Sequence, residues 1–138
     1  MARSTKTTAE TLQDELAAVT NVELTLHALL SKADHRRYDR AEAVEVTSAT
    51  LTEDLSRVSG TVVGTTATYE SRITITPRRG FRCTCPDCRD RGHRVGPCKH
   101  IIALAEHALE DLCEPKARMV LDAIEVEAFG APSIPPEG

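Results

Sequence analysis

Apolar residues recur with a helical period near the beginning of this chain. Thr7-Thr8-Ala9-Glu10 is a capping-box pattern, in which the first and last side chains satisfy the free N–H groups that begin a helix. The apolar positions that follow on one side of that helix are Leu12, Leu16, Val19, Val22, Leu26, Leu29 and Leu30. A second capping box, Thr20-Asn21-Val22-Glu23, leaves open whether one helix or two helices form. We interpret residues 31–40, which carry four basic side chains, as a solvated polar link.

The period changes to two from residue 42 onward, which predicts β-strands. We expect a first strand to end near Leu51. A second should span residues 55–63 with a bulge at Gly60, and a third should span residues 67–76. A fourth strand is expected over residues 81–85, and the short connections between the strands predict an antiparallel β-meander.

The third strand has the clearest alternation in the chain. It predicts that Ile73 and Ile75 are buried and that Arg72 and Thr74 are exposed, because successive strand residues face opposite sides of a sheet. Pro77-Arg78-Arg79-Gly80 has proline and glycine placed for a tight turn into the fourth strand.

A helical pattern returns at Cys98 and continues to about Leu112, where Glu114-Pro115 is expected to end the helix. A last helix over residues 116–129 should end at Gly130. Residues 1–6 and the proline-containing segment 131–138 are expected to be disordered. Together these elements predict an α+β fold, a small antiparallel β-meander with flanking helices.

Four of the five cysteines and two of the five histidines fall within residues 83–100. Thiolate sulfur and neutral imidazole are the ligands that tetrahedral Zn²⁺ prefers, and the spacing is C-x-C, twelve residues, then C-x-H. A strand would place Cys83 and Cys85 on one face. Cys98 would lie at a helix start, where the helix dipole favours thiolate, and His100 would follow in the first turn. We therefore predict a zinc site formed by Cys83, Cys85, Cys98 and His100.

Other roles for these residues stay open. A ligand set of Cys85, Cys88, Cys98 and His100 would also suit zinc, and His93 lies in the same loop. Redox thiols are a further alternative, and Cys113 is expected to be a small buried apolar residue. The first residues show no apolar leader segment and no apolar run is long enough to cross a membrane, so we expect a cytoplasmic protein without disulfides.

Charge is unevenly distributed along the chain. Residues 72–100 carry eight Lys/Arg against two Asp/Glu, net +6, whereas residues 1–71 have net charge −4 and residues 101–138 have net charge −6. A basic segment between two acidic ones predicts an anionic partner at the zinc segment. The candidate nucleic-acid-binding residues are Arg78, Arg79, Arg82, Arg89, Arg91, Arg94 and Lys99.

The motif and its surroundings resemble the SWIM-type zinc finger, which is defined by C-x-C, a variable spacer and C-x-H. The residues that carry the resemblance are Val62–Gly64, Tyr69–Ile73, Cys83–Pro86 and Pro97–Leu104. It covers about residues 55–110 and implies strands before the motif, a helix after it, and binding to DNA or protein rather than catalysis. The domains predicted on this basis are an N-terminal helical extension (1–33), a SWIM-type zinc-binding domain (42–112, finger core 80–105), a C-terminal helix (114–130) and a disordered tail (131–138).

Two functions follow as hypotheses. In the first, the chain is a zinc-binding accessory protein that binds DNA non-specifically, acts in a DNA recombination, repair or mobile-element complex, or does both. It would be nucleoid-associated if it binds DNA. In the second, it is a protein–protein adaptor with a purely structural zinc, and a protein partner or self-association through the N-terminal helix is expected. No phosphate-binding loop or kinase signature is present, so we do not expect an enzyme.

Overall fold

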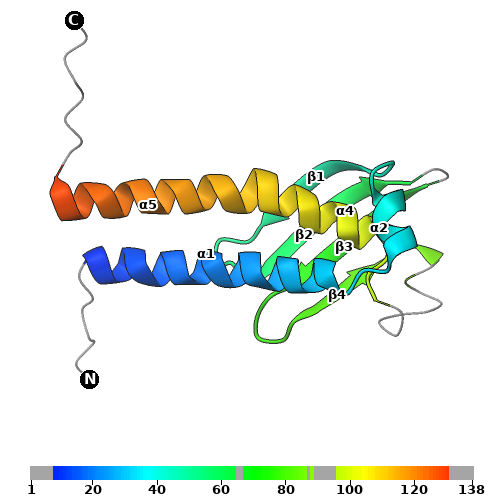
Figure 1. Ribbon diagram of the computed structural model, residues 1–138, viewed down its shortest axis with the longest axis horizontal. Helices are drawn as coiled ribbons and strands as arrows, with labels where there is room; N and C mark the ends of the chain where they lie inside the picture. Colours follow the sequence, from blue (N-terminus) through cyan, green and yellow to red (C-terminus); the bar gives the residue numbers. More distant parts are fainter. Residues whose placement is uncertain (1–7, 65–66, 87, 89–95, 131–138) are drawn as a thin grey trace, which may run out of the picture.

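The computed structural model describes residues 8–64, 67–86, 88 and 96–130, which form an α+β fold with helices along one antiparallel sheet (Figure 1). The predicted fold class is therefore confirmed. In chain order the elements are α1 (Thr8–Ser31), α2 (His35–Ala41), β1 (Glu45–Leu51), β2 (Arg57–Val63), β3 (Thr68–Thr74), β4 (Gly80–Cys83), α4 (Lys99–Ala108), the π-helical turn η2 (Leu109–Cys113) and α5 (Glu114–Phe129). The segments predicted to be disordered, 1–6 and 131–138, lie outside the described residues.

The sheet has the strand order β1-β2-β3-β4, and each strand pairs antiparallel with the next, as in the predicted meander. Ile73 and Ile75 are buried and Arg72 is exposed, which confirms the predicted alternation at these positions. Thr74 is half-buried rather than exposed. It lies in register between Arg57 on β2 and Gly80 on β4, so neighbouring strands cover it from both sides.

Helices α1 and α4 pack on one face of this sheet. Leu26 of α1 and Leu104 of α4 share a buried core with Val58 of β2 and Ile73 of β3. All four side chains are completely shielded from solvent (0% exposed). The opposite face, which we call the outer face, carries the polar positions of the alternation, and residues such as Arg72 are exposed there.

The predicted bulge at Gly60 is wrong. Pairing between β2 and β3 is regular through Gly60, and the register shift lies instead in β1, between Val46 and Ser48. Glycine is needed at position 60 for space. A Cβ atom there would lie 2.6 Å from Leu104 Cδ1 and 2.7 Å from the carbonyl oxygen of Ser48.

We expect Gly60→Ala to destabilise the fold by about 1–3 kcal/mol, because the added methyl group would have to displace backbone as well as a core leucine. Chemical denaturation followed by circular dichroism would measure the change. Gly80→Ala is the matched control, because no atom lies within 4 Å of a Cβ built at that position. Equal stability of the two variants would contradict this account of Gly60.

The N-terminal stripe forms one continuous helix, α1. Thr20 and Asn21 lie in its interior, and the Thr25 hydroxyl donates a hydrogen bond of 2.8 Å to the Asn21 carbonyl. The second capping box does not begin a new helix, because the buried side of the helix continues across it from Val19 to Val22. Burial of a continuous apolar face stabilises the helix more than a local cap would interrupt it.

The interpretation of residues 31–40 as a solvated link is wrong in part, because this segment contains most of the short helix α2. The Asp34 carboxylate accepts a 2.9 Å hydrogen bond from the Arg37 backbone N–H and caps the helix. Ala41 packs with Ile102 and Ala103 of α4. Ala41 is the only apolar residue that α2 buries. A single buried apolar residue gives no helical period, so the sequence pattern did not indicate this helix.

The predicted helix end at Glu114-Pro115 is also wrong, since α4, η2 and α5 follow one another without a break. In η2 the Glu114 N–H bonds to the Leu109 carbonyl, five residues back. Pro115 then lies in the first turn of α5, where the hydrogen-bonding pattern changes and a missing N–H is tolerated. The predicted end of α5 at Gly130 is confirmed, and this glycine has a φ angle of +82°.

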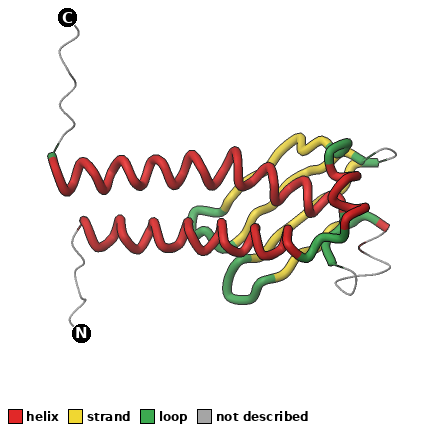
Figure 2. The backbone as a smooth tube through the Cα atoms, in the orientation of Figure 1, coloured by secondary structure: helices red, strands yellow, loops and turns green. Residues whose placement is uncertain are grey.

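Helices α1 and α5 run side by side in opposite directions beyond the sheet, as the tube view shows (Figure 2). Lys116 Nζ lies 2.7 Å from Glu15 Oε1 and joins the two helices, and Val120 of α5 is buried. No helix in the described part of the chain is both long and apolar enough to cross a membrane.

Candidate metal centre

Strand β4 carries the first candidate ligand into the core. Cys83 pairs in register with Ser71 of β3, on the inward face. The strand ends at Cys83 rather than at Cys85 as predicted, although the Thr84 N–H still bonds to the Glu70 carbonyl at 3.1 Å. The chain turns at Cys85, whose sulfur accepts a 3.4 Å hydrogen bond from the Cys88 backbone N–H. Cys85 is buried in this turn, next to the end of β4.

The other two candidates lie at the start of α4. Pro97 is buried before Cys98, which is the N-cap residue and has extended backbone angles (φ −75°, ψ 168°). Its carbonyl accepts the Ile102 N–H at 3.0 Å and so begins the helix. His100 follows in the first turn, as predicted, and it is buried.

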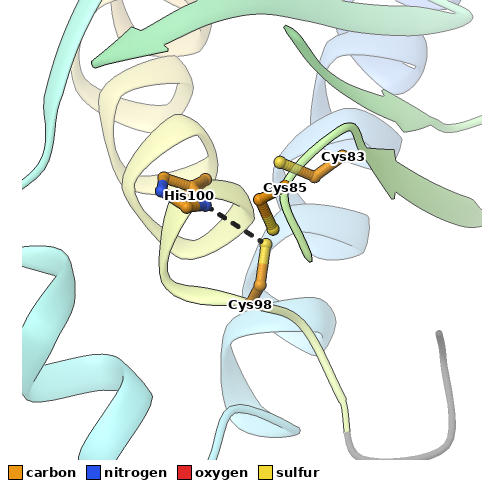
Figure 3. A group of neighbouring side chains, drawn as sticks. All are labelled: Cys83, Cys85, Cys98 and His100. Atoms are coloured by element: carbon orange, nitrogen blue, oxygen red, sulfur yellow. Dashed lines mark hydrogen bonds between the residues drawn. The ribbon is translucent and has the colours of Figure 1, made fainter. Parts of the chain in front are cut away.

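The fold brings the four candidate ligands together in one buried group. The ligand atoms of Cys83, Cys85, Cys98 and His100 all lie within 4.8 Å of one another, and their side chains converge between β4 and α4 (Figure 3). The His100 Nδ1 atom lies 3.9 Å from the Cys98 sulfur. Three sulfurs and one imidazole nitrogen, shielded from water and within reach of one another, are compatible with a metal site.

Hydrogen bonds decide which thiol of the group ionises most easily. Cys83 forms hydrogen bonds with Cys98, His100 and Ser71, and these hold its pKa well below the ordinary value, although burial opposes the shift. The hydrogen bond with Cys83, then burial, raise the pKa of Cys98, and burial raises the pKa of Cys85. A divalent cation among these sulfurs would favour the thiolate form of all three.

No protein-family model, curated protein or solved structure matches this chain. The likeness to the SWIM-type zinc finger therefore depends on the ligand spacing and on the elements that carry it. The C-x-C pair begins at the end of β4, and the C-x-H pair lies at the start of α4. Membership of that family stays a prediction.

The remaining cysteines, Cys88 and Cys113, and the alternative ligand His93 lie outside the four-residue group. Cys88 is half-buried and is not a member of the four-residue group; it contributes its backbone N–H to Cys85. His93 lies outside the described residues. Cys113 is fully buried in the core, as predicted, and burial raises the pKa of its thiol to about 11.

Two residues beside the group were not predicted from the sequence. The Ser71 hydroxyl donates a 3.3 Å hydrogen bond to the Cys83 sulfur, and the Tyr69 ring lies 4.8 Å from the His100 ring, centre to centre. Both therefore contact candidate ligands, as residues around a metal centre commonly do. The sequence could have indicated Ser71, because it places a polar hydroxyl group on the buried side of the strand, in the alternation that continues with Ile73 and Ile75.

The predicted nucleic-acid-binding residues do not all share one surface. Arg78 and Arg79 are exposed between β3 and β4, and Arg79 borders a hollow next to α1. Arg82 is exposed in a different hollow, on the outer face, and Lys99 is half-buried at the start of α4. Three further candidates lie outside the described residues: Arg89, Arg91 and Arg94.

Proposed function

We propose that this chain is a zinc-binding accessory protein in which the ion joins β4 to α4, and that it binds DNA without sequence preference. One observation supports the zinc most strongly, namely the four buried ligand atoms within 4.8 Å of one another. In this proposal the zinc centre stabilises the fold, and basic residues around it contact the DNA. The biological setting would be a DNA recombination, repair or mobile-element complex.

Zinc is the ion that this donor set favours. Sulfur-rich sites with imidazole suit zinc, whereas calcium and magnesium require oxygen ligands. In this proposal Nδ1 of His100, which lies 3.9 Å from the Cys98 sulfur, binds the ion, so the ring proton is on Nε2, which is buried and has no hydrogen-bond partner among the described residues. A zinc with four protein ligands leaves no position for water or substrate. The ion is therefore structural in this proposal and is not expected to catalyse a reaction.

Charge supports the DNA-binding part. Residues 72–100 have net charge +6, and a Cys3His zinc centre offsets little of it, because three thiolates and one Zn²⁺ together carry −1. A polyanion would displace counterions from this segment and gain affinity from their release. The resemblance to the SWIM-type finger, a module of DNA-associated complexes, favours the same partner.

A salt series tests this proposal. We expect the zinc-loaded protein to bind a short DNA duplex at low salt, with micromolar or weaker affinity near physiological salt, and to weaken steeply as salt rises. Arg89→Glu/Arg91→Glu/Arg94→Glu should abolish binding while zinc content and circular dichroism stay unchanged. Arg36→Glu/Arg40→Glu/Arg118→Glu changes the charge equally on exposed helical positions and should retain binding. Absence of binding by the folded wild type at low salt would refute the DNA-binding function.

A protein–protein adaptor is the second candidate, and exposed apolar residues on α5 favour it. Phe129 is 84% exposed and Met119 is 60% exposed, and Leu121 and Val126 are exposed on the same helix. Leu24 of α1 is exposed as well, so self-association through the N-terminal helix remains part of this proposal. Contiguous apolar patches mark interaction surfaces, and the spacing of Met119, Val126 and Phe129 (i, i+7, i+10) places these three near one side of α5. In the absence of DNA binding, a co-purifying protein or a dimer in solution would support this candidate.

A further inference from the structure

Strand register places three arginines of different strands together on the outer face. Arg72 of β3 and Arg82 of β4 are directly opposite each other. Arg72 is also opposite Ser59 of β2, and Arg57 lies two residues before Ser59 on the same side of that strand. All three arginines are exposed. Because neighbouring strands lie about 4.8 Å apart, the arginines form a stripe about 10 Å long across three strands.

This arrangement is electrostatically unfavourable, and a bound anion would relieve it. Like charges directly opposite each other in an antiparallel pair are destabilising. Within the described part of the chain, none of the three arginines forms an ion pair. The carboxylate nearest to them in register is Glu70, which instead accepts hydrogen bonds of 3.2 and 3.4 Å from the Thr61 hydroxyl. The stripe with Glu70 therefore carries a net charge of about +2.

The stripe borders a hollow of about 390 Å³ that Ser59, Glu70 and Thr84 also line. The Thr84 hydroxyl oxygen accepts the Glu70 backbone N–H at 3.0 Å, so its hydrogen is available to donate outward. Guanidinium groups are planar forks that match phosphate oxygens in pairs, and hydroxyl groups add single donors. The donor set of this hollow therefore suits phosphate groups.

Aromatic residues decide what kind of phosphate-bearing ligand fits. Tyr69 and Phe81 both face the other side of the sheet, where Tyr69 contacts His100 and Phe81 pairs with Ile73. The described outer face offers no aromatic ring on which a base could stack, so single strands gain little there. Contacts to phosphates alone favour the backbone of a duplex, read without sequence preference.

We infer that the outer face holds a binding site for the backbone phosphates of duplex DNA, formed by Arg57, Arg72 and Arg82. This site rests on the proposed DNA-binding function and gives it a surface on the sheet. It also connects that surface to the zinc centre. Arg82 faces outward on β4 while the next residue, Cys83, faces inward into the metal-binding group, so the ion fixes the edge strand that presents Arg82.

Fluorescence anisotropy with a 20-base-pair duplex tests this site on the full-length, zinc-loaded protein. Each phosphate contact contributes about 0.9 to the slope of log K against log salt. Arg57→Gln/Arg72→Gln/Arg82→Gln should reduce the steepness of that slope by about 2–3 and weaken binding at 50 mM salt by roughly 100-fold. Zinc content and the circular dichroism spectrum should match the wild type. The wild type should bind the duplex more tightly than a single strand of equal length.

Arg36→Gln/Arg40→Gln/Arg118→Gln removes the same charge from exposed helical positions and should leave the slope nearly unchanged. If the wild type binds DNA and the sheet variant keeps its slope and affinity, the outer-face site is wrong while the proposed function stands. Tighter binding to the single strand would overturn the assignment to duplex DNA. If the wild type binds neither probe at low salt, the proposed function fails and this site fails with it.

Discussion

Cys98→Ser is expected to release the metal and unfold the region around residues 80–112. Serine is a favourable helix N-cap, and Cys98 makes no side-chain capping bond in this structure, so helix initiation itself should not suffer. The expected loss of stability comes from the loss of the metal, because a structural zinc site contributes on the order of 10 kcal/mol to folding. Zinc per chain by mass spectrometry and thermal unfolding by circular dichroism would measure the two effects. Replacing any of the other three candidate ligands should likewise release the metal and unfold this region. They are Cys83, Cys85 and His100.

Cys88→Ser is the matched control, since it removes a thiol from the same segment that is not a member of the four-residue group and keeps the backbone N–H that bonds to Cys85. It should keep one zinc per chain and most of the stability. If Cys88→Ser removes the zinc while Cys83→Ser does not, the ligand set with Cys88 is the correct one.

Ile73→Ala is expected to destabilise the protein by about 2–5 kcal/mol, because it leaves a cavity in the core. Ile73 lies on β3 between Val58 of β2 and Phe81 of β4, is completely buried, and belongs to the core that α1 and α4 complete. Chemical denaturation would give the change in the free energy of unfolding. Thr68→Ala, at an exposed position of the same strand, should change it by less than about 0.5 kcal/mol. Equal effects of the two substitutions would contradict the placement of Ile73 in the core.

The sheet and the candidate Cys3His group could be predicted because their signals are local. Alternation along residues 67–76 depends only on which side of a strand each residue faces, and the buried Ile73 and Ile75 agree with it. The C-x-C and C-x-H pairs each lie at the end of a predictable element. The meander then brings β4 and α4 together, and with them the four ligand atoms.

Features that depend on long-range packing were not predictable from local patterns. The stop expected at Glu114-Pro115 assumed α-helical hydrogen bonding, and the π turn before it changes the bonding partner of Glu114. Gly60 suggested a bulge, but the reason for the glycine is the distant Leu104. Helix α2 depends on a cap at Asp34 and a contact of Ala41 with α4, neither of which gives a period.

The arginine stripe could not be predicted from the distribution of charge along the chain, for the same reason. Counting along the chain groups Arg82 with the loop arginines that follow it and assigns Arg57 to an acidic segment. Strand register instead places Arg57 and Arg82 on either side of Arg72, on one face of the sheet. A surface formed by several strands is visible only once the pairing of those strands is known.

X-ray absorption at the zinc edge, on protein purified without added metal, tests the central proposal most directly. A Cys3His site predicts one zinc per chain with about three sulfur neighbours near 2.3 Å and one nitrogen neighbour near 2.0–2.1 Å. Cys83, Cys85 and Cys98 would supply the sulfurs and His100 the nitrogen. A folded protein that contains no zinc, or a zinc shell with oxygen neighbours or only two sulfurs, would contradict the proposed centre.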